Sequence, residues 1–332
     1  MPLLVEQGTG PCLLGRSWFD DLGIGMQGIH SFSDSATKWL NHKVFQEGLG
    51  QFTGPPVSVD ITPDAIPIFK KFRPVPFALK EKVDAAIDKM VQDGVLEPVA
   101  YSKWATPTVP VCKRDGTIRI CGDYKCTVNT GSSPDTYSLP TATEIFAILS
   151  NGKLFTKLDL NQAYLQLPLD ENSSNILTLN KPRGLFRVKR LPFGVSAAPG
   201  IFQRVMDTML KGIPGVATFL DDVIISGSTP HEHDQRVQAV LDKLRQAGLR
   251  VNHRKTLFAK DELEFLGFHI NAKGIQPSKS KVAAIHNAPE PTNKKELQAF
   301  LGLVNFYERF LQNKATLLEP LNRLLDKNAK WD

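Results

Sequence analysis

The stretch "VATFLDDVIIS", residues 216–226, is an apolar run that two adjacent carboxylates interrupt. Apolar, β-prone residues flank the pair Asp221-Asp222, which predicts two short buried strands that reverse direction at the carboxylates. Aspartate is common in tight turns. A carboxylate enclosed by apolar residues is nevertheless costly without a partner, so something must neutralise this pair. The stretch "SWFDDLGIG", residues 17–25, repeats the motif with Asp20-Asp21, and we expect only one of the two pairs to carry chemistry.

Composition and charge narrow the class of protein. The 332 residues suffice for one large domain or two ordinary ones, and 42% hydrophobic and 22% charged residues are typical of a soluble globular protein. No apolar run approaches the ~20 residues of a membrane span, and the N-terminal residues lack a secretory pattern. The net charge of +6 and the pI of about 9.0 are compatible with a phosphate-rich partner. Four cysteines without CxxC spacing argue against zinc and disulfides and favour a reducing compartment.

Predicted helices and strands are interspersed along the chain, which indicates an α+β fold. Two β-rich runs around Asp115-Gly116 predict a hairpin over 105–124, a strand and tight turn are expected within 152–169, and "ELEFLGFHI" at 262–270 is expected to be a strand. Apolar periodicity predicts several helices. Their boundary signals are a stop at Gly94, the capping box Thr141-x-x-Glu144, a start at Pro199, a stop at Gly248 and a start at Asn293-x-x-Glu296.

A third carboxylate, Asp159 in "TKLDLNQAY", is also embedded in a predicted strand. Two neighbouring strands would bring it beside Asp221 and Asp222, where three carboxylates repel one another unless cations lie among them. Mg²⁺ prefers a few carboxylates together with substrate phosphates. Two such ions about 4 Å apart hold the attacking and leaving oxygens of a phosphoryl transfer. Each element alone is more often an ordinary turn or sheet-edge aspartate, so this prediction depends on their combination.

Several ordered blocks resemble the reverse transcriptases of gypsy-class LTR retrotransposons. The blocks are "KLDLNQAYLQLPL", "LPFGVSAAPGIFQRVMD", "FLDDVIISG" and "EFLGFHI". Upstream, "GVLEPVAYSKWATPTVPVCKRDGTIRICGDYKCTVN" is similar to the fingers segment of that family, and downstream "GIQPSKSKVAAIHNAPEPTNKKELQAFLGLVNFYERFL" is similar to its connection segment. The resemblance covers about residues 55–332. It implies an α+β right-hand polymerase fold with fingers, palm and thumb.

The resemblance also implies site residues. Asp159, Asp221 and Asp222 match the catalytic, metal-binding triad of the family, with the carbonyl of Leu160 as a further ligand. Two Mg²⁺ ions are the implied cofactors, for which Mn²⁺ can substitute. Tyr164 matches the steric gate, whose ring would collide with a ribose 2′-hydroxyl and so favour dNTPs. From the residues alone, Tyr164 is equally a core aromatic.

Further positions are assigned to nucleotide and nucleic-acid binding by the same resemblance. Lys113 and Arg119 match the fingers cations that hold the triphosphate, and Lys255 matches a palm lysine near the leaving pyrophosphate. Without the family, these three would be solvated surface charges. The remaining implied positions are Phe193 and Gly194 for the dNTP, and Gln203, Phe219, Phe265, Leu266 and Gly267 for template and primer, the last three in the "FLGFH" primer-grip hairpin.

The chain departs from the family pattern in places. Phe219 stands where the family usually has Tyr, and Lys125 stands where Arg is common, which gives up a bidentate fork. Residues 177–186 match more loosely than their neighbours. None of these departures removes a predicted metal ligand.

The N-terminal stretch "PCLLGRSWFDDLGI" resembles the closing strand and helix of a retropepsin-like aspartic protease, whose catalytic Asp-Thr-Gly is absent here. Asp20-Asp21 is therefore expected to be a remnant. The GxGxxG spacing of Gly23, Gly25 and Gly28 lacks a strand-to-helix context and predicts no dinucleotide site. His231 and His233 are expected at a solvated helix start, not at a metal site. The predicted divisions are 1–25 (protease remnant), 26–54 (linker), 55–235 (fingers and palm), 236–275 (palm end and primer grip) and 276–332 (thumb and connection leading to an absent RNase H domain).

These observations predict an RNA-directed DNA polymerase of a retroelement, a nucleotidyltransferase that extends a primer with dNTPs. Its partners would be RNA and DNA template-primers, dNTPs and the other polyprotein domains, namely protease, RNase H and the integrase that completes DNA integration. A cytoplasmic location, with packaging in virus-like particles, is expected, and no membrane contact. Two alternatives stay open. One is an inactive nucleic-acid-binding relic, and the other is a nuclease or ribonuclease H activity of the parent polyprotein.

Overall fold

The computed structural model describes residues 38–112, 116–132, 137–326, 329 and 331. The chain divides into two compact units, Met1–Asn41 and His42–Asp332, and the first is described only from residue 38 onward. The predicted protease remnant with Asp20-Asp21, the glycine motif that follows it, the start of the predicted linker and Lys113 lie outside the described residues.

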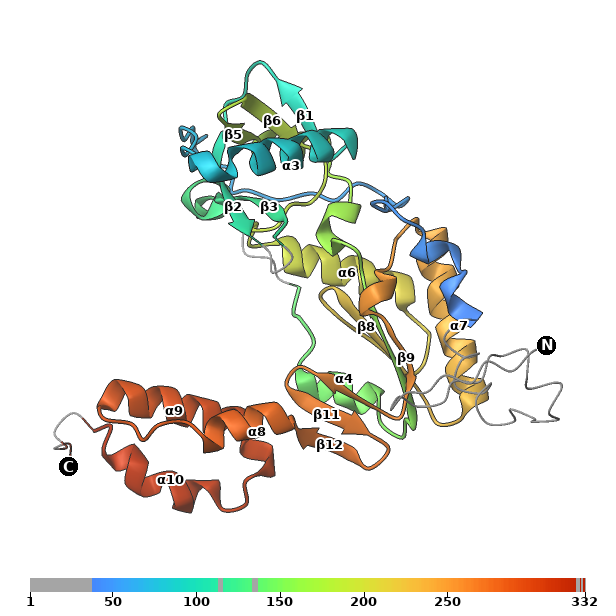
Figure 1. Cartoon of the computed structure of the whole chain (residues 1–332), viewed down its shortest axis with the longest axis vertical. Coiled ribbons are helices and arrows are strands. Elements are labelled where there is room, and N and C mark those ends of the chain that lie inside the picture. Colours follow the sequence, from blue (N-terminus) through green and yellow to red (C-terminus); the bar gives the residue numbers. More distant parts are fainter. Residues whose placement is uncertain (1–37, 113–115, 133–136, 327–328, 330, 332) are drawn as a thin grey trace, which may run out of the picture. The chain divides into compact units, whose positions relative to one another are not determined.

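The second unit mixes helices and strands throughout, as predicted (Figure 1). Its helices are α3 (Lys80–Gln92), α4 (Ala142–Ile148), α5 (Glu171–Ile176), α6 (Ala198–Leu210), α7 (Pro230–Gln246), α8 (Lys279–His286), α9 (Lys294–Phe306) and α10 (Lys314–Arg323). Its strands are β1 (Leu96–Val99), β2 (Thr106–Cys112), β3 (Ile118–Gly122), β4 (Leu154–Asp159), β5 (Leu179–Lys181), β6 (Gly184–Val188), β7 (Val216–Phe219), β8 (Asp222–Gly227), β9 (Leu257–Lys260), β10 (Glu262–Phe265), β11 (Phe268–Asn271) and β12 (Gly274–Pro277).

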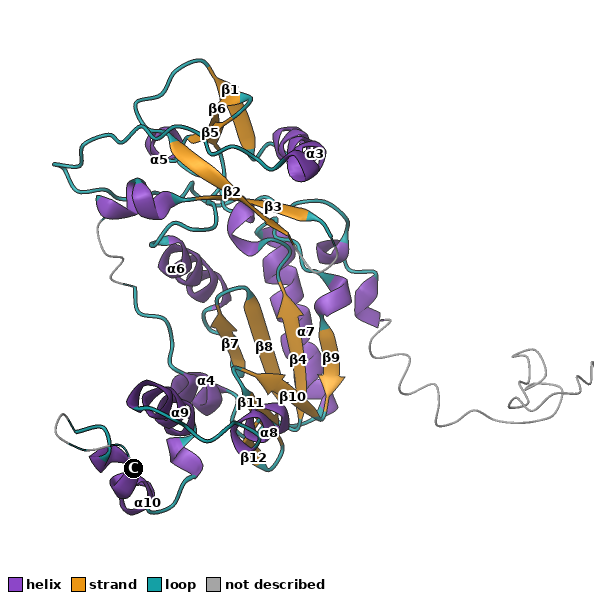
Figure 2. Cartoon of the chain, turned by 60° about the vertical axis from the view of Figure 1, so that its left-hand side comes forward, coloured by secondary structure: helices purple, strands orange, loops and turns teal. Residues whose placement is uncertain are grey.

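The central sheet has the strand order β7-β8-β4-β9, and its neighbouring strands are all antiparallel (Figure 2). Side chains alternate between its two faces. Leu158, Val223 and Ile225 share one face and are fully buried, where α7 packs against β8 and β4. Phe155 and Ile224 lie on the opposite face, which α4 and the β10–β11 hairpin cover. Burial on both faces fixes the register of β4 and β8, because a slip of one residue would exchange the faces.

A second sheet has the order β1-β6-β5-β2-β3, in which β2 and β5 run parallel. Helix α3 packs against β3 and β1. The predicted hairpin over 105–124 is confirmed: β2 and β3 are antiparallel, and Gly116 in their connection has φ +77°, a conformation that glycine adopts without steric cost.

The third sheet, β10-β11-β12, corrects one prediction. The stretch 262–270 is not a single strand but a hairpin, since Leu266 and Gly267 both take positive φ and turn the chain between β10 and β11. This agrees with the predicted hairpin at "FLGFH". Phe268 packs edge-on against Phe146 of α4 at 5.2 Å between ring centroids, which joins this sheet to the core beneath the central sheet.

Helix starts follow the predicted capping signals. The Thr141 side chain accepts from the Glu144 N–H while Glu144 accepts from the Thr141 N–H. The Asn293 side chain likewise accepts from the Glu296 N–H at the start of α9, but Glu296 accepts from the Thr292 N–H. Each such cap contributes ~1 kcal/mol. Across the part of the chain that the structure describes, we find no helix with the length and apolar character that crossing a bilayer requires.

Candidate active site

The structure brings the three predicted carboxylates together at one end of the central sheet. Asp159 ends β4, Asp222 begins β8, and the two are direct partners in the antiparallel register. Because Phe219 pairs with Asp222 across β7 and β8, Leu220 and Asp221 form a two-residue turn between these strands. The Leu160 N–H donates to the carbonyl of Asp221 at 2.9 Å, so the end of β4 is tied to this turn.

Gln203 on α6 forms hydrogen bonds to the backbone of the turn that contains Asp221. Leu220 has φ +54°, a left-handed conformation that is strained for a residue other than glycine. The side-chain carbonyl of Gln203 accepts from the Leu220 N–H at 3.0 Å, and its amide donates to the carbonyl of Thr218 at 2.9 Å and to Asp207 at 3.0 Å. The Gln203 side chain is fully buried, and its place in a nucleotide and template pocket stays a prediction.

Two lysines partner the paired carboxylates. Lys157 lies two residues before Asp159 on the same face of β4, and its ammonium group is 2.7 Å from a carboxylate oxygen of Asp222. Lys255 approaches Asp159 at 3.3 Å. Lys255 was predicted near this position, whereas Lys157 was missed. The signal was available, since residues i and i+2 of a strand share a face.

The carboxylates also perturb one another. Burial is the main cause that raises the pKa of Asp159, with a further rise from the Asp221 charge and an opposing effect of Lys255. Burial likewise raises the pKa of Asp222, against the effect of Lys157, and the charges of Asp221 and Asp159 raise it further. Closely spaced carboxylates with raised pKa values favour an arriving cation, because a cation relieves both repulsion and desolvation.

The donor chemistry fits a hard divalent cation, which takes oxygen ligands. The geometry is less complete. Among the residues that the structure describes, no three His, Cys, Asp or Glu side chains converge closely enough to hold a metal ion. Lys157 and Lys255 supply the neighbouring positive charge instead. The predicted metal ions, and the role of the Leu160 carbonyl, therefore stay proposals.

Three of the residues predicted to bind the nucleotide, Arg119, Tyr164 and Phe193, contact one another. The Arg119 guanidinium lies 4.9 Å from the ring centroid of Phe193, and the Tyr164 ring is 5.1 Å from that of Phe193. Burial, followed by the charge of Asp221, raises the pKa of Tyr164, which places this tyrosine within electrostatic reach of the turn. Gly194 next to Phe193 has φ +97°.

A cavity of about 520 Å³ opens at Arg119 and Phe193 and extends under α3. Its volume falls in the range of ~300–1,000 Å³ that is usual for small-molecule sites. The structure thus gathers Arg119, Tyr164, Phe193 and Gly194 into one neighbourhood, as predicted from the resemblance, while their role in dNTP binding stays a prediction.

The predicted primer-grip hairpin lies on the other side of the carboxylates. Phe219 of β7 contacts Phe265 of β10 edge-on at 6.2 Å between centroids, and Lys157 lies 5.6 Å from the Phe265 ring. Leu266 packs against the same core, and Gly267 accepts at 2.8 Å from the Tyr307 hydroxyl after α9. The contacts of Phe219 are apolar, so the missing tyrosine hydroxyl leaves the packing of this hairpin intact.

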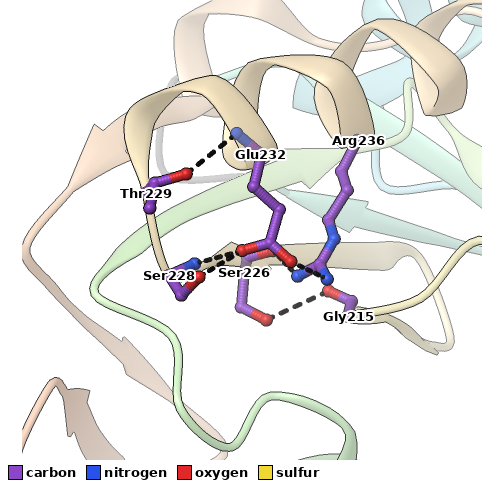
Figure 3. Close-up of polar contacts among 6 residues, drawn as sticks. All are labelled: Gly215, Ser226, Ser228, Thr229, Glu232 and Arg236. Atoms are coloured by element: carbon purple, nitrogen blue, oxygen red, sulfur yellow. Dashed lines mark hydrogen bonds and ion pairs between the residues drawn. The ribbon is translucent and has the colours of Figure 1, made fainter.

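The far end of β8 is fixed by a polar network at the start of α7 (Figure 3). Arg236 ion pairs with Glu232 and donates to the carbonyl of Ser226 at 2.7 Å. The Ser226 hydroxyl donates to the carbonyl of Gly215 at 3.2 Å, and Glu232 accepts from the Ser228 N–H at 2.8 Å. Strand β8 is therefore held at both ends, which limits movement of Asp222 along its axis.

His233 corrects a second prediction. His231 is exposed at the start of α7, as expected, but His233 is fully buried and its Nε2 is 2.9 Å from the Thr156 hydroxyl of β4. Burial lowers the pKa of His233. Charged residues flank His233 in the sequence, so its burial against the central sheet could not be predicted from them.

The solved structures that this chain is similar to define its class. The chain matches the foamy viral protease-reverse transcriptase in complex with dsDNA at a TM-score of 0.80 and 26% identity, covering 100% of this chain and 70% of that chain. It matches the same kind of protein in complex with an RNA/DNA hybrid at a TM-score of 0.76 and 26% identity, covering 98% and 44%. The chain therefore has the right-hand polymerase fold, of the α+β class, as predicted.

The sequence comparisons name the family. Residues 111–270 match the family described as reverse transcriptase (RNA-dependent DNA polymerase). The chain is 37% identical over 273 residues to an uncharacterized protein of Caenorhabditis elegans (82% of this chain, 21% of that protein) and 35% identical over 264 residues to a retrovirus-related Pol polyprotein from transposon opus of Drosophila melanogaster (78% and 26%). The chain belongs to the reverse transcriptase family of retrotransposon polyproteins, and it spans about a fifth to a quarter of these relatives.

Proposed function

We propose that this chain is an RNA-directed DNA polymerase that extends a primer 3′-end with dNTPs. The observation that carries the proposal is the direct pairing of Asp159 with Asp222 across β4 and β8, with Asp221 in the adjoining turn, inside a reverse transcriptase domain. The similar foamy viral structures hold dsDNA or an RNA/DNA hybrid, which supports the same partners for this chain.

Asp159, Asp221 and Asp222 would hold two Mg²⁺ ions. When bound, these ions supply the positive charge that lowers the pKa of the primer 3′-hydroxyl and holds the triphosphate. The side chain of Lys255 is 65% exposed beside Asp159, so its ammonium group can turn from the carboxylate to the leaving pyrophosphate. Arg119, held over Phe193, would bind the triphosphate from the fingers side.

Sugar selection would depend on Tyr164. Its ring is fixed between Phe193 and Phe202, with centroids at 5.1 and 5.3 Å. A ring fixed in this way cannot swing aside for a ribose 2′-hydroxyl, which favours dNTPs. We also propose fingers and palm within residues 55–235, palm end and primer grip within 236–275, and thumb and connection from 276 onward.

The test is primer extension by the purified chain on an RNA template with a DNA primer, dNTPs and Mg²⁺. Asp222→Asn keeps the side-chain shape and should abolish extension. Asp261→Asn changes an exposed aspartate between β9 and β10 and should leave extension unchanged. A folded chain that binds template-primer and adds no nucleotide would refute the proposal.

A further inference from the structure

A buried glutamine lies just beyond the strand that ends at Asp159. Gln166 closes the short 3₁₀ helix Ala163–Gln166 and is fully buried. Its side-chain amide donates to the carbonyl of Asn161 at 2.8 Å and to that of Arg250 at 2.9 Å, and its side-chain oxygen accepts from the Arg250 N–H at 2.7 Å. Both N–H donors and the acceptor of the side chain are therefore used. Loss of these bonds would leave buried polar groups without partners.

The backbone segments that Gln166 joins run antiparallel beside each other and reach Asp159. The contacts between them are the Asn161 N–H donating to the Arg250 carbonyl at 3.0 Å, the bridge of Leu160 with Val251, and the Asn252 N–H donating to the Asp159 carbonyl at 2.8 Å. Gln166 fastens one end of this ladder, and Asp159 lies at the other end. The side chain of Gln166 therefore acts on Asp159 through the backbone.

A segment from the N-terminal side of the chain contacts Gln166. We name residues 48–53 the strap. The Phe52 N–H donates to the backbone carbonyl of Gln166 at 2.8 Å, and the side-chain amide of Asn161 donates to the Gly48 carbonyl at 3.1 Å. The strap thus bonds to both ends of the turn that follows Asp159.

Gly50 of the strap lies directly against the Gln166 side chain. Gly50 is buried, and a Cβ at this position would overlap the side-chain oxygen of Gln166 and lie 2.9 Å from the Arg250 nitrogen. Arg190 connects the same parts, because it donates to the Gln51 side chain at 2.7 Å and to the Gln166 carbonyl at 3.3 Å. The strap therefore limits the positions that Gln166 can take.

We propose that Gln166 is a positioning residue that fixes the backbone of Asp159, and that the strap holds Gln166 in place. The effect on catalysis rests on the proposed polymerase function, whereas the effect on the backbone does not. A misplacement of about 1 Å in a reacting group can cost ~100-fold in rate. The strap would thereby influence the reaction from a distant part of the sequence.

The test combines hydrogen–deuterium exchange with primer extension on the full chain. Gln166→Met keeps the length of the side chain and removes its hydrogen bonds, and Gly50→Ala pushes the strap away from Gln166. In both variants, peptides that cover residues 159–161 and 250–252 should exchange roughly tenfold faster than in the parent chain. Exchange in the β10–β11 hairpin should stay unchanged.

Matched controls make the same substitutions at exposed positions. Gln46 is exposed, and Gly302 is exposed in α9 with no heavy atom within 4 Å of an added Cβ. Gln46→Met and Gly302→Ala should therefore match the parent chain in exchange and in extension.

The Mg²⁺ concentration for half-maximal extension separates positioning from partial unfolding. A displaced Asp159 should raise this concentration roughly tenfold and lower kcat about 100-fold. Unfolded molecules would lower the amplitude of extension alone. An unchanged Mg²⁺ midpoint would assign Gln166 to stability and overturn its positioning role.

Exchange decides the proposal without catalysis. Unchanged exchange at 159–161 in Gln166→Met would overturn it, and so would a uniform rise over the whole chain. If circular dichroism shows that Gln166→Met does not fold, Gly50→Ala is judged by the same criteria. A parent chain that is inactive in extension would refute the proposed function, and the exchange result would still show whether Gln166 and the strap fix this backbone.

Discussion

Gln203→Leu should loosen the carboxylate turn while leaving its surroundings filled. Leucine is close to glutamine in size, so packing of α6 against β7 is retained, but the Leu220 N–H loses its acceptor at a residue whose φ of +54° is already unfavourable. An unsatisfied buried donor costs ~1–3 kcal/mol, and the lost bonds to Thr218 and Asp207 cost ~1 kcal/mol each. Together these contributions predict a loss of ~3–5 kcal/mol in the free energy of unfolding. A displaced Asp221 and Asp222 should lower kcat about 100-fold.

The chain contains a matched control for this change. Gln238 bonds Asp242 four residues later on α7, just as Gln203 bonds Asp207 on α6, but Gln238 is exposed. Gln238→Leu should therefore change stability by less than ~0.5 kcal/mol. Urea denaturation and single-nucleotide incorporation, measured on both variants, give the comparison. If Gln203→Leu costs no more stability than Gln238→Leu and leaves kcat unchanged, the argument that Gln203 holds the turn fails.

Three further outcomes are expected. Burial lowers the pKa of His233 below its usual 6.5, so near that pH the imidazole is protonated in the unfolded chain but not in the folded chain. Protonation therefore favours unfolding, and the urea midpoint should fall as the pH drops from about 7 to 5. The fall should be less steep in His233→Gln. The pKa of Asp159 is raised, chiefly by burial and against the effect of Lys255, so the charged carboxylate is unfavourable in the folded chain. Asp159→Asn should therefore leave the stability at pH 7 equal or higher. Primer extension by this variant should fall roughly 10³-fold, because several kcal/mol of charge stabilisation are lost. Gly194→Ala should weaken dNTP binding in a nucleotide titration, because a Cβ there would lie 2.8 Å from the Gly122 carbonyl at φ +97°; equal affinity in parent and variant would contradict this.

Local signals in the sequence predicted the elements of the site well. The apolar, β-prone residues on both sides of Asp221-Asp222 predict a buried hairpin, and the structure confirms it. The strand that ends at Asp159 follows from the same pattern. The apolar pattern could not predict the strand order β7-β8-β4-β9, because strand order depends on contacts between residues far apart along the chain. For that step the family resemblance was required.

The error at His233 has a physical origin. Polar residues on helices usually face solvent, which was the expectation for His233. His233 is fully buried here because it bonds to the Thr156 hydroxyl of the central sheet, just as the buried Gln203 bonds to the Leu220 N–H. A pattern of apolar and polar letters cannot distinguish a polar side chain in water from one that bonds to a partner inside the fold.

Lysine side chains explain why the apolar hairpin tolerates these carboxylates without a metal ion. Lys157, on strand β4, pairs with Asp222, and Lys255, in the short 3₁₀ helix His253–Lys255 before β9, pairs with Asp159. The pKa values of both carboxyl groups nevertheless remain raised, so the two lysines compensate burial only in part. Carboxyl groups with raised pKa values favour added positive charge, because it relieves their repulsion and desolvation. The two lysines therefore make the buried carboxylates tolerable in the folded chain, and the raised pKa values still favour binding of the ions that the proposed reaction needs.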